Sequence, residues 1–260
     1  MRRILFTVCG RAGSKGFRNK NVQILNGIPL VCYTLGAIKL YIEAHPEDDV
    51  KIAVNTDSNV LKQQIEDQHI LSKVDFVERD ASLAGDITPK VEVVKATYFA
   101  EREKYGEFDH VIDLDITSPI RRLQDIEAAI DEMDQCKEYD LVFSVVESRR
   151  SPYFNMVERK LDGKYGKICE LNFTARQQTP KCYDMNASIY DYRPAFLEIE
   201  IDKTILSYCC GIVIMPDFRV LDIDSEEDLI ELEYLISYVS KHDVGLSSLL
   251  RVIEKYIIII

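Results

Sequence analysis

The residues best suited to chemistry lie in a glycine-broken loop near the N-terminus, "GRAGSKGFRNKN" at residues 10–21. Its cationic side chains are Arg11, Lys15, Arg18 and Lys20, and its glycines are Gly10, Gly13 and Gly16. Glycines let backbone N–H groups approach an anion, and cations add charge-assisted hydrogen bonds to phosphate oxygens. The spacing matches neither a Walker A loop nor the Gly-x-Gly-x-x-Gly dinucleotide fingerprint. The loop therefore predicts a phosphate site of another kind, with a merely solvated basic loop as the alternative.

Two pairs of carboxylates are the second candidate for chemistry. They are Asp113 with Asp115 in "DLD" and Asp222 with Asp224 in "DID". Residues two apart in an extended strand point to the same face, so each pair can present both carboxylates to one side. Such oxygen ligands suit Mg²⁺, which takes one or two carboxylates together with substrate phosphates and water. Because the chain is acidic, a purely structural role is the alternative for either pair.

Asp228 has a different predicted role. In "SEED", at residues 225–228, a serine is followed three positions later by an acidic residue, which is the pattern of a capping box. Apolar residues recur at helical spacing beyond it. We therefore expect Asp228 to cap a helix rather than to bind a ligand.

The bulk composition limits the function classes. The chain has 260 residues, a formal net charge of −12 and a pI near 4.9, which argues against nucleic-acid binding because a phosphate backbone needs a basic face. No signal peptide is visible, and the apolar tail "YIIII" at 256–260 is too short to span a bilayer. That tail could be an edge strand, an interface segment or a frayed end. The seven cysteines are scattered without metal spacing, which predicts free thiols and a cytoplasmic location.

Strand-like and helix-like segments alternate through about residue 146. The strand-like runs are residues 3–8, 50–54, 74–77, 110–115 and 140–146. Helix-periodic apolar positions follow Pro29 and recur between residues 126 and 133. This alternation predicts an α/β fold with a mostly parallel sheet and helices on both faces. Ligands of such sheets bind at the carboxyl ends of the strands, where the basic loop and both acidic pairs are expected.

The rhythm is lost from residue 147 to about residue 207. This segment is rich in Tyr, Asn, Pro and Lys and contains hairpin-like turns such as "LDGKYGK". The alternation resumes with "YCCGIVIM" and a terminal helix. We therefore predict one domain over residues 1–260, with an excursion from the sheet at about 147–207.

These residues resemble a known family, the sugar-activating cytidylyltransferases of the CMP-N-acylneuraminate (CMP-sialic acid) synthetase type. The basic loop is similar to the family's signature loop, and further motifs follow in order along essentially the whole chain. They are "NTD" at 55–57, "RDASLAGD" at 79–86, "DITSPIR" at 115–121, "TARQQTPKCYDMNASIY" at 174–190 and "DIDSEEDL" at 222–229. Within the family, the chain looks most like the branch that activates legionaminic acid, a bacterial sialic-acid analogue. The resemblance implies a Rossmann-like nucleotidyltransferase fold.

The resemblance also implies a reaction, in which CTP and a nine-carbon nonulosonic acid give a CMP-sugar and pyrophosphate with the help of Mg²⁺. The implied nucleotide-binding residues are Arg11, Gly13, Ser14, Lys15, Asn21, Arg79, Ala84 and Gly85. Arg11 and Lys15 would hold the triphosphate, and Arg79 would help to select cytosine. Asp222 and Asp224 would hold Mg²⁺ beside the α-phosphate. The implied catalytic set is Arg11, Lys15, Asp115, Asp222 and Asp224.

The implied substrate-binding residues are Asp115, Thr117, Ser118, Arg176, Gln177, Asn186 and Tyr190. Arg176 would be a partner for the sugar carboxylate. The excursion would be the family's dimerisation element, which reaches into the neighbouring subunit of a homodimer. One departure concerns Asp115, where sialate enzymes typically carry Gln. A carboxylate there could accept hydrogen bonds from sugar hydroxyls, bind metal or act as a base.

Other functions stay open at this point. Asp113 and Asp115 could form the metal-binding motif of a glycosyltransferase that consumes a nucleotide sugar, although such an enzyme does not need to grip a free triphosphate. A CMP-KDO synthetase is a second alternative, but the Gln-Gly-Asp motif usual in those enzymes is absent. A non-catalytic nucleotide sensor would leave both acidic pairs without a purpose.

Overall fold

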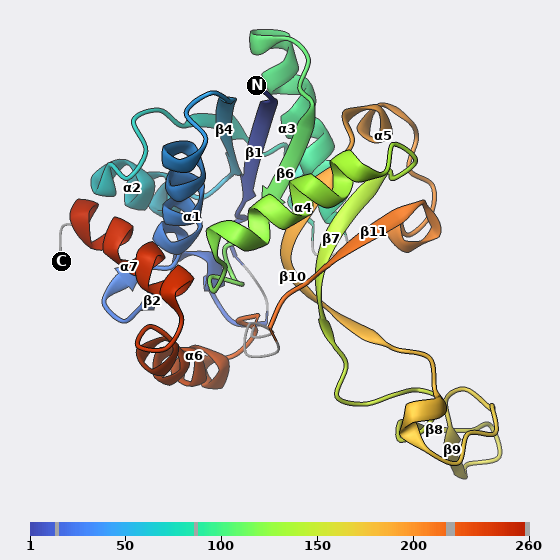
Figure 1. The fold of residues 1–260 in the computed structure, drawn as a ribbon. Helices are drawn as coiled ribbons and strands as arrows, with labels where there is room; N and C mark the ends of the chain where they lie inside the picture. Colours follow the sequence, from blue (N-terminus) through green and yellow to red (C-terminus); the bar gives the residue numbers. More distant parts are fainter. Residues whose placement is uncertain (14–15, 86–87, 217–221, 258–260) are drawn as a thin grey trace.

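The computed structural model describes residues 1–13, 16–85, 88–216 and 222–257. Over these residues the main sheet has seven strands in the order β11-β7-β10-β6-β1-β4-β5 (Figure 1). Its strands are β1 (Arg3–Cys9), β4 (Asp49–Thr56), β5 (Asp75–Glu78), β6 (His110–Leu114), β7 (Leu141–Glu147), β10 (Tyr183–Tyr192) and β11 (Cys210–Ile214). Neighbouring strands are parallel except where β10 pairs with β6 and β7. The predicted mostly parallel sheet is confirmed.

Helices cover both faces of this sheet. They are α1 (Val31–Ala44), α2 (Asn59–Gln68), α3 (Lys90–Tyr105), α4 (Leu123–Gln135), α5 (Pro194–Glu198), α6 (Glu226–Val239) and α7 (Val244–Tyr256). Short 3₁₀ turns lie at Lys20–Val22, Ala81–Leu83, Arg176–Gln178 and Ile205–Ser207. Successive side chains of β1 enter different cores. Phe6 belongs to a core that includes residues of α1, α2, α4, α6 and α7, and Leu5 belongs to a core that includes residues of α3 and α5. Burying a side chain of this size contributes about 1.5–3 kcal/mol, so both faces are held firmly.

The predicted excursion ends earlier than residue 207, and this boundary is corrected. Strand β10 lies inside the predicted excursion but belongs to the main sheet, where Tyr190 pairs with Asp113 of β6 and Phe143 of β7. Its sequence, "YDMNASIYDY", hides a strand because several of its buried residues are polar. Side chains of neighbouring segments bond to Asn186, Ser188 and one oxygen of Asp191 in the folded protein. A search for alternating apolar residues cannot detect such a strand.

Residues 148–182 are the part that leaves the sheet. This segment carries a small antiparallel hairpin of β8 (Val157–Arg159) and β9 (Tyr165–Lys167), in agreement with the predicted hairpin-like turns. In Figure 1 the hairpin projects away from the body of the molecule. We call residues 148–182 the projecting segment.

Two local predictions are confirmed by the structure. The seven cysteines are all free thiols. Asp228 closes the capping box of α6: its N–H donates to Ser225 Oγ at 3.1 Å, and its Oδ2 accepts from the Ser225 N–H at 2.8 Å.

None of the helices in the described ranges is both long enough and apolar enough to cross a membrane. The last tail residues, 258–260, lie outside the described residues.

Candidate active site

A cavity of about 190 Å³ opens where β1 and β6 end, and we call it the strand-end cavity. It is lined by Cys9, Arg11, Lys20, Asn21, Arg79, Leu83, Gly85, Thr88, Lys90, Val93, Asp115, Thr117 and Asp222. Segments from all along the chain therefore meet at the carboxyl edge of the sheet, which is where α/β folds bind ligands. The sequence-predicted basic loop and one residue of each acidic pair lie here.

The basic loop is anchored at its start to the "NTD" segment. The Gly10 N–H donates to the Asn55 carbonyl at 3.1 Å, and the Ala12 N–H donates to Asp57 Oδ1 at 2.7 Å. A Cβ on Gly10 would lie 2.5 Å from the Leu61 side chain, so a larger residue would not fit there. Gly13 has a positive φ of 66°, which favours glycine. Ser14 and Lys15 lie outside the described residues.

Two arginines line the strand-end cavity. Arg79 is buried and donates from Nε to Asn55 Oδ1 at 2.9 Å. Arg11 donates from Nη1 to the Ala84 carbonyl at 3.4 Å, and the Arg11 carbonyl accepts from Asn21 Nδ2 at 3.1 Å. Of the residues predicted to bind the nucleotide, Arg11, Asn21, Arg79 and Gly85 line the strand-end cavity, and the Ala84 carbonyl contacts Arg11. Gly13 is not among the lining residues.

Asp115 is held as an ionised carboxylate. Its Oδ2 lies 2.5 Å from Lys90 Nζ, and its Oδ1 accepts from the Thr117 N–H at 3.0 Å and from Thr117 Oγ1 at 2.9 Å. Burial opposes ionisation, but Lys90 and Thr117 outweigh it and hold the pKa of Asp115 well below its usual range. A carboxylate with so low a pKa is a poor base at neutral pH. Of the three roles considered for Asp115, the structure favours metal binding or hydrogen-bond acceptance.

Asp222 lies in the same cavity but in a different electrostatic state. Burial, followed by the nearby charge of Asp115, raises its pKa. Its Oδ1 is buried and has no hydrogen-bond donor among the residues that the structure describes. The neighbouring Ile223 N–H donates to the Thr117 carbonyl at 3.0 Å, which ties this segment to the loop after β6. Two carboxylates converge here, and one of them has an oxygen left over for a ligand.

Asp224 is placed differently from Asp222. Its side chain is 72% exposed, and its Oδ1 lies 2.8 Å from Lys20 Nζ. Asp224 is not among the residues lining the strand-end cavity. The carboxylates that line the strand-end cavity are therefore Asp115 and Asp222, one from each sequence pair, and Asp224 contacts the lining residue Lys20.

Lys90 is a site residue that the sequence reasoning missed. It begins α3, and its Nζ lies 2.7 Å from Asp113 Oδ2 as well as 2.5 Å from Asp115 Oδ2. Both carboxylates of "DLD" do point to one side, as predicted, but they meet a lysine there. Nothing in the sequence around "TPK" marks this residue, because its partners come from a different strand.

A second cavity of about 480 Å³, which we call the aromatic cavity, adjoins the first through the shared residue Lys90. It is lined by Pro89, Lys90, Val91, Glu92, Tyr190, Tyr192, Ile201, Asp202, Lys203, Thr204 and Ile205. The rings of Tyr190 and Tyr192 stack with centroids 6.1 Å apart, and Lys90 Nζ lies 5.7 Å from the Tyr190 centroid. Tyr190, one of the predicted substrate-binding residues, thus lines a cavity beside Lys90.

Two other predicted substrate residues support the framework instead of lining these two cavities. Ser118 and Asn186 are both buried, and Ser118 Oγ donates to the Asn186 carbonyl at 3.0 Å. The Asn186 side chain accepts from Ser144 Oγ at 2.6 Å. These bonds join the loop after β6 to β10 and join β10 to β7, and so support the loop that carries Asp115 and Thr117.

A buried arginine completes this framework. Arg121 is fully buried and donates from Nε to Ser188 Oγ at 3.1 Å and from Nη1 to Thr34 Oγ1 at 3.0 Å. Its Nη2 donates to the backbone carbonyls of Asp115 and Ser118. Burial lowers the pKa of Arg121 to about 10, so it still carries its charge at neutral pH. Arg121 therefore fixes the backbone from which Asp115 projects.

Arg176 and Gln177 lie on the projecting segment, apart from the other site residues. They line a third cavity, of about 260 Å³, that shares no lining residue with the strand-end or aromatic cavity. Arg176 donates from Nη2 to the Ser148 carbonyl at 2.9 Å. Within one chain, the structure does not bring these two residues to the strand-end cavity.

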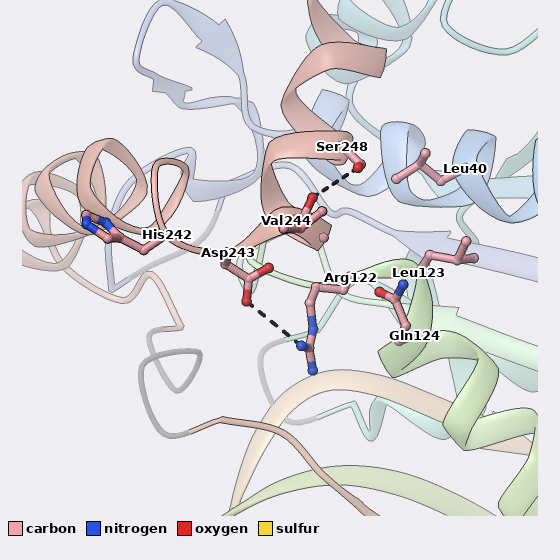
Figure 2. A pocket seen from close by; sticks show the side chains of 9 residues that line it. Leu40, Arg122, Leu123, Gln124, His242, Asp243, Val244 and Ser248 are labelled. Carbon is pink, nitrogen blue, oxygen red and sulfur yellow. Dashed lines mark hydrogen bonds and ion pairs between the residues drawn. The ribbon is translucent and has the colours of Figure 1, made fainter.

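A further cavity, of about 460 Å³, lies near the start of α4 and of α7 (Figure 2). Its charged groups neutralise one another: Arg122 contacts Asp125 at 2.8 Å and Asp243 at 3.8 Å. The second of these contacts is drawn as a dashed line in Figure 2. This cavity lies at the ends of helices and not at the ends of strands, and none of the predicted site residues lines it.

Comparisons with known proteins show which family this chain resembles in sequence and in fold. A model of the cytidylyltransferase family matches residues 5–238. Post-translational flagellin modification protein B of Campylobacter coli is 35% identical over 244 residues, covering 91% of this chain and 96% of that protein. CMP-N,N'-diacetyllegionaminic acid synthase of Campylobacter jejuni is 37% identical over 239 residues, with the same 91% and 96% coverage. The solved structure of CMP:2-keto-3-deoxy-manno-octonic acid synthetase complexed with CTP has a TM-score of 0.62, 14% identity and coverage of 91% and 99%, which is a similarity of fold.

Proposed function

This chain belongs to the cytidylyltransferase family, and we propose that it transfers the CMP group of CTP to a nine-carbon nonulosonic acid, releasing pyrophosphate. The relative named as a CMP-N,N'-diacetyllegionaminic acid synthase supports an acceptor of this class. The observation that carries the proposal is the junction of two cavities at Lys90. One contains arginines and paired carboxylates suited to a nucleotide, and the other contains aromatic and aliphatic side chains suited to a sugar.

In the proposed reaction, the oxygen of the anomeric hydroxyl attacks the α-phosphorus of CTP in line, the hydroxyl proton passes to solvent, and the bond to pyrophosphate breaks. Nucleotidyl transfer depends mainly on positioning the reactants and neutralising charge. Arg11 and Lys15 would bind the triphosphate, and Arg79 with the backbone of residues 84–85 would contact cytosine. Because the pKa of Asp115 is low, we propose that Asp115 contributes its negative charge to the site and does not remove a proton.

The residues of the strand-end cavity fit a divalent cation. Asp222 has a buried oxygen without a donor among the described residues, and the charge of Asp115 acts on it from nearby. Hard carboxylate oxygens of this kind suit Mg²⁺. We propose that Asp115 and Asp222 would hold the ion, and that Asp224 acts with them by positioning Lys20. When bound, Mg²⁺ supplies charge neutralisation for the phosphates.

The aromatic cavity suggests which nonulosonic acid is preferred. Legionaminic acid has an acetamido group at carbon 7 and a deoxy carbon 9, where sialic acid carries hydroxyls. Ile201, Ile205 and Tyr190 offer apolar surface to such groups. An apolar site of this kind leaves few buried polar groups without a hydrogen-bond partner when the substrate lacks a hydroxyl.

We expect kcat/KM to be at least about tenfold higher with legionaminic acid than with N-acetylneuraminic acid, a difference of roughly 1.4 kcal/mol. The measurement is pyrophosphate release with CTP, Mg²⁺ and a panel of legionaminic, N-acetylneuraminic, pseudaminic and KDO acids. An equal or better efficiency with N-acetylneuraminic acid would contradict the proposed preference and leave the general nonulosonate activity standing. Activity with KDO alone would instead favour the eight-carbon alternative.

We also propose that the enzyme is a homodimer whose projecting segment completes the partner's site. The segment exposes apolar side chains that a second chain could cover: Phe154, Met156, Val157, Leu161, Tyr165, Ile168 and Leu171. It also carries Arg176 and Gln177, which are remote from the aromatic cavity of their own chain. A site shared between subunits accounts for both features.

Mixing two inactive variants tests the shared site. Arg176→Ala and Asp222→Asn homodimers are each expected to be nearly inactive. After unfolding and refolding together, heterodimers would regain one intact site, so a random mixture should recover roughly a quarter of wild-type activity. Either variant mixed with itself is the control. No recovery, with heterodimers demonstrated by mass, would show that both residues act within one chain.

A further inference from the structure

We propose that Lys90 binds the carboxylate of the acceptor acid and so orients its reacting hydroxyl toward the nucleotide. This inference rests on the proposed function, because it takes a sugar acid as the acceptor. It assigns a substrate contact to a residue that no sequence motif identifies and that the sequence-predicted site does not contain. Its basis is the position of Lys90 between two cavities, the hydrogen-bonding capacity of its ammonium group and the chemistry of the acceptor.

Lys90 is the residue that joins the two cavities. It lines both the strand-end cavity and the aromatic cavity. Its position is fixed at the start of α3 and by two carboxylates, with Nζ 2.7 Å from Asp113 Oδ2 and 2.5 Å from Asp115 Oδ2. The side chain nevertheless remains 31% exposed. A partly exposed ammonium group is therefore carried by a residue that lines both cavities.

The ammonium group retains capacity for a ligand. A lysine has three N–H donors, and its polar partners within the described part of the chain are the carboxylates of Asp113 and Asp115. Two carboxylates within 2.7 Å of Nζ favour the charged ammonium form that lysine ordinarily has at neutral pH. The face of the Tyr190 ring lies on another side, 5.7 Å from Nζ. A charged donor can thus be offered to an anion at the boundary of the cavities.

The acceptor chemistry places an anion at that boundary. In the ring form of a 2-keto sugar acid, the carboxylate and the reacting hydroxyl are attached to the same carbon. If Lys90 holds the carboxylate, the hydroxyl faces the strand-end cavity and the rest of the sugar extends into the aromatic cavity. Arg176, which the family resemblance suggests as the carboxylate partner, lies on the projecting segment and is bonded to the Ser148 carbonyl.

The test compares the acceptor acid with its C1 amide in pyrophosphate-release kinetics. The amide keeps the size of the carboxylate but removes its charge. Wild-type enzyme should prefer the acid strongly in kcat/KM. Lys90→Met should lose about 10- to 100-fold with the acid but much less with the amide, because a charge-assisted hydrogen bond disappears only for the acid. Lys39→Met is the matched control, since Lys39 lines neither cavity and pairs with Glu43.

Several results would overturn this inference. Equal losses with acid and amide in Lys90→Met would show that Lys90 only positions Asp115, and an acid preference that vanishes in Arg176→Ala instead would assign the carboxylate to Arg176. Lys90→Met leaves the carboxylates of Asp113 and Asp115 without a positive partner, which can prevent folding. In that case the double variant Lys90→Met with Asp113→Asn replaces the single variant in the same comparison. Wild-type enzyme that is active but does not distinguish acid from amide would also overturn it. Wild-type enzyme without pyrophosphate release would contradict the proposed function itself.

Discussion

Asp222→Asn is expected to lower kcat/KM by about two to three orders of magnitude, or roughly 2.7–4 kcal/mol of transition-state stabilisation, while the fold stays intact. Asparagine has the shape of aspartate, and Asp222 Oδ1 makes no hydrogen bond within the described residues that the change could break. Removing the charge also removes the cost of burying an ionised group and the repulsion from Asp115, the two effects that raise the pKa of Asp222 in the folded protein. The loss should therefore appear in catalysis and not in stability. Steady-state pyrophosphate release and thermal unfolding measure the two separately.

Magnesium titration identifies the cause of that loss. If Asp222 holds the metal, the half-saturating Mg²⁺ concentration should rise in Asp222→Asn, and excess Mg²⁺ should restore part of the activity. Asp228→Ala is the matched control from the same segment, because its carboxylate caps α6. It should cost about 1 kcal/mol of stability and change turnover little. Equal losses of activity in both variants would contradict the assignment of Asp222 to metal binding and of Asp228 to helix capping.

Arg11→Ala should reduce turnover by about two orders of magnitude with unchanged circular dichroism. Arg11 lines the strand-end cavity, and the backbone of its loop is fixed by bonds to Asn55 and Asp57. A guanidinium held in that way can stabilise the charge that develops on the phosphates without first being ordered. The same loss is predicted for Lys15→Ala from its place in the basic loop.

Arg18→Ala is the matched control for the basic loop. Arg18 is exposed and does not line the strand-end cavity, although it belongs to the same loop. Turnover close to wild type is expected for this variant. If Arg11→Ala and Lys15→Ala were also close to wild type, the loop would be a solvated surface feature, which is the alternative that its sequence leaves open.

The fold class and the location of the site can be predicted from the sequence because both depend on local patterns. Apolar runs such as residues 140–146 give strands, and the periodic positions after Pro29 give α1. In parallel sheets these patterns also fix where loops meet, so the sequence alone places the basic loop and Asp115 at one edge of the sheet. The capping box that contains Asp228 spans four residues, so it too can be predicted from a local pattern, and the structure confirms it.

The pairings within the site could not be predicted in the same way. The partnership of Lys90 with Asp113 and Asp115 joins a helix start to a neighbouring strand end, and such a contact depends on the packing of α3 against the sheet. Spacing alone suggested that Asp222 works with Asp224, whereas burial places Asp222 beside Asp115 and turns Asp224 to Lys20. Side-chain direction after a strand is set by tertiary contacts, which sequence spacing does not contain.

Strand β10 shows a second limit. It is a long strand in the middle of the sheet, yet Asn186, Ser188 and Asp191 are buried in it. Sequence patterns of alternating apolar residues identify strands by the side chains that face the core, so buried polar residues conceal this strand. Asn186 and Ser188 also bond to the loop after β6, so a part of the fold that is hard to predict supports the site.

The central claim is that this protein joins the CMP group of CTP to a nonulosonic acid, and the most direct test is ³¹P NMR of the purified enzyme with CTP, Mg²⁺ and legionaminic acid. The three CTP resonances should be replaced by one phosphodiester resonance and by pyrophosphate in equal molar amounts, only when acid and metal are both present. In a parallel sample that contains a nucleotide sugar in place of CTP, its consumption with release of free nucleotide would instead identify a glycosyltransferase. An unchanged CTP spectrum with every acid of the panel would contradict the account.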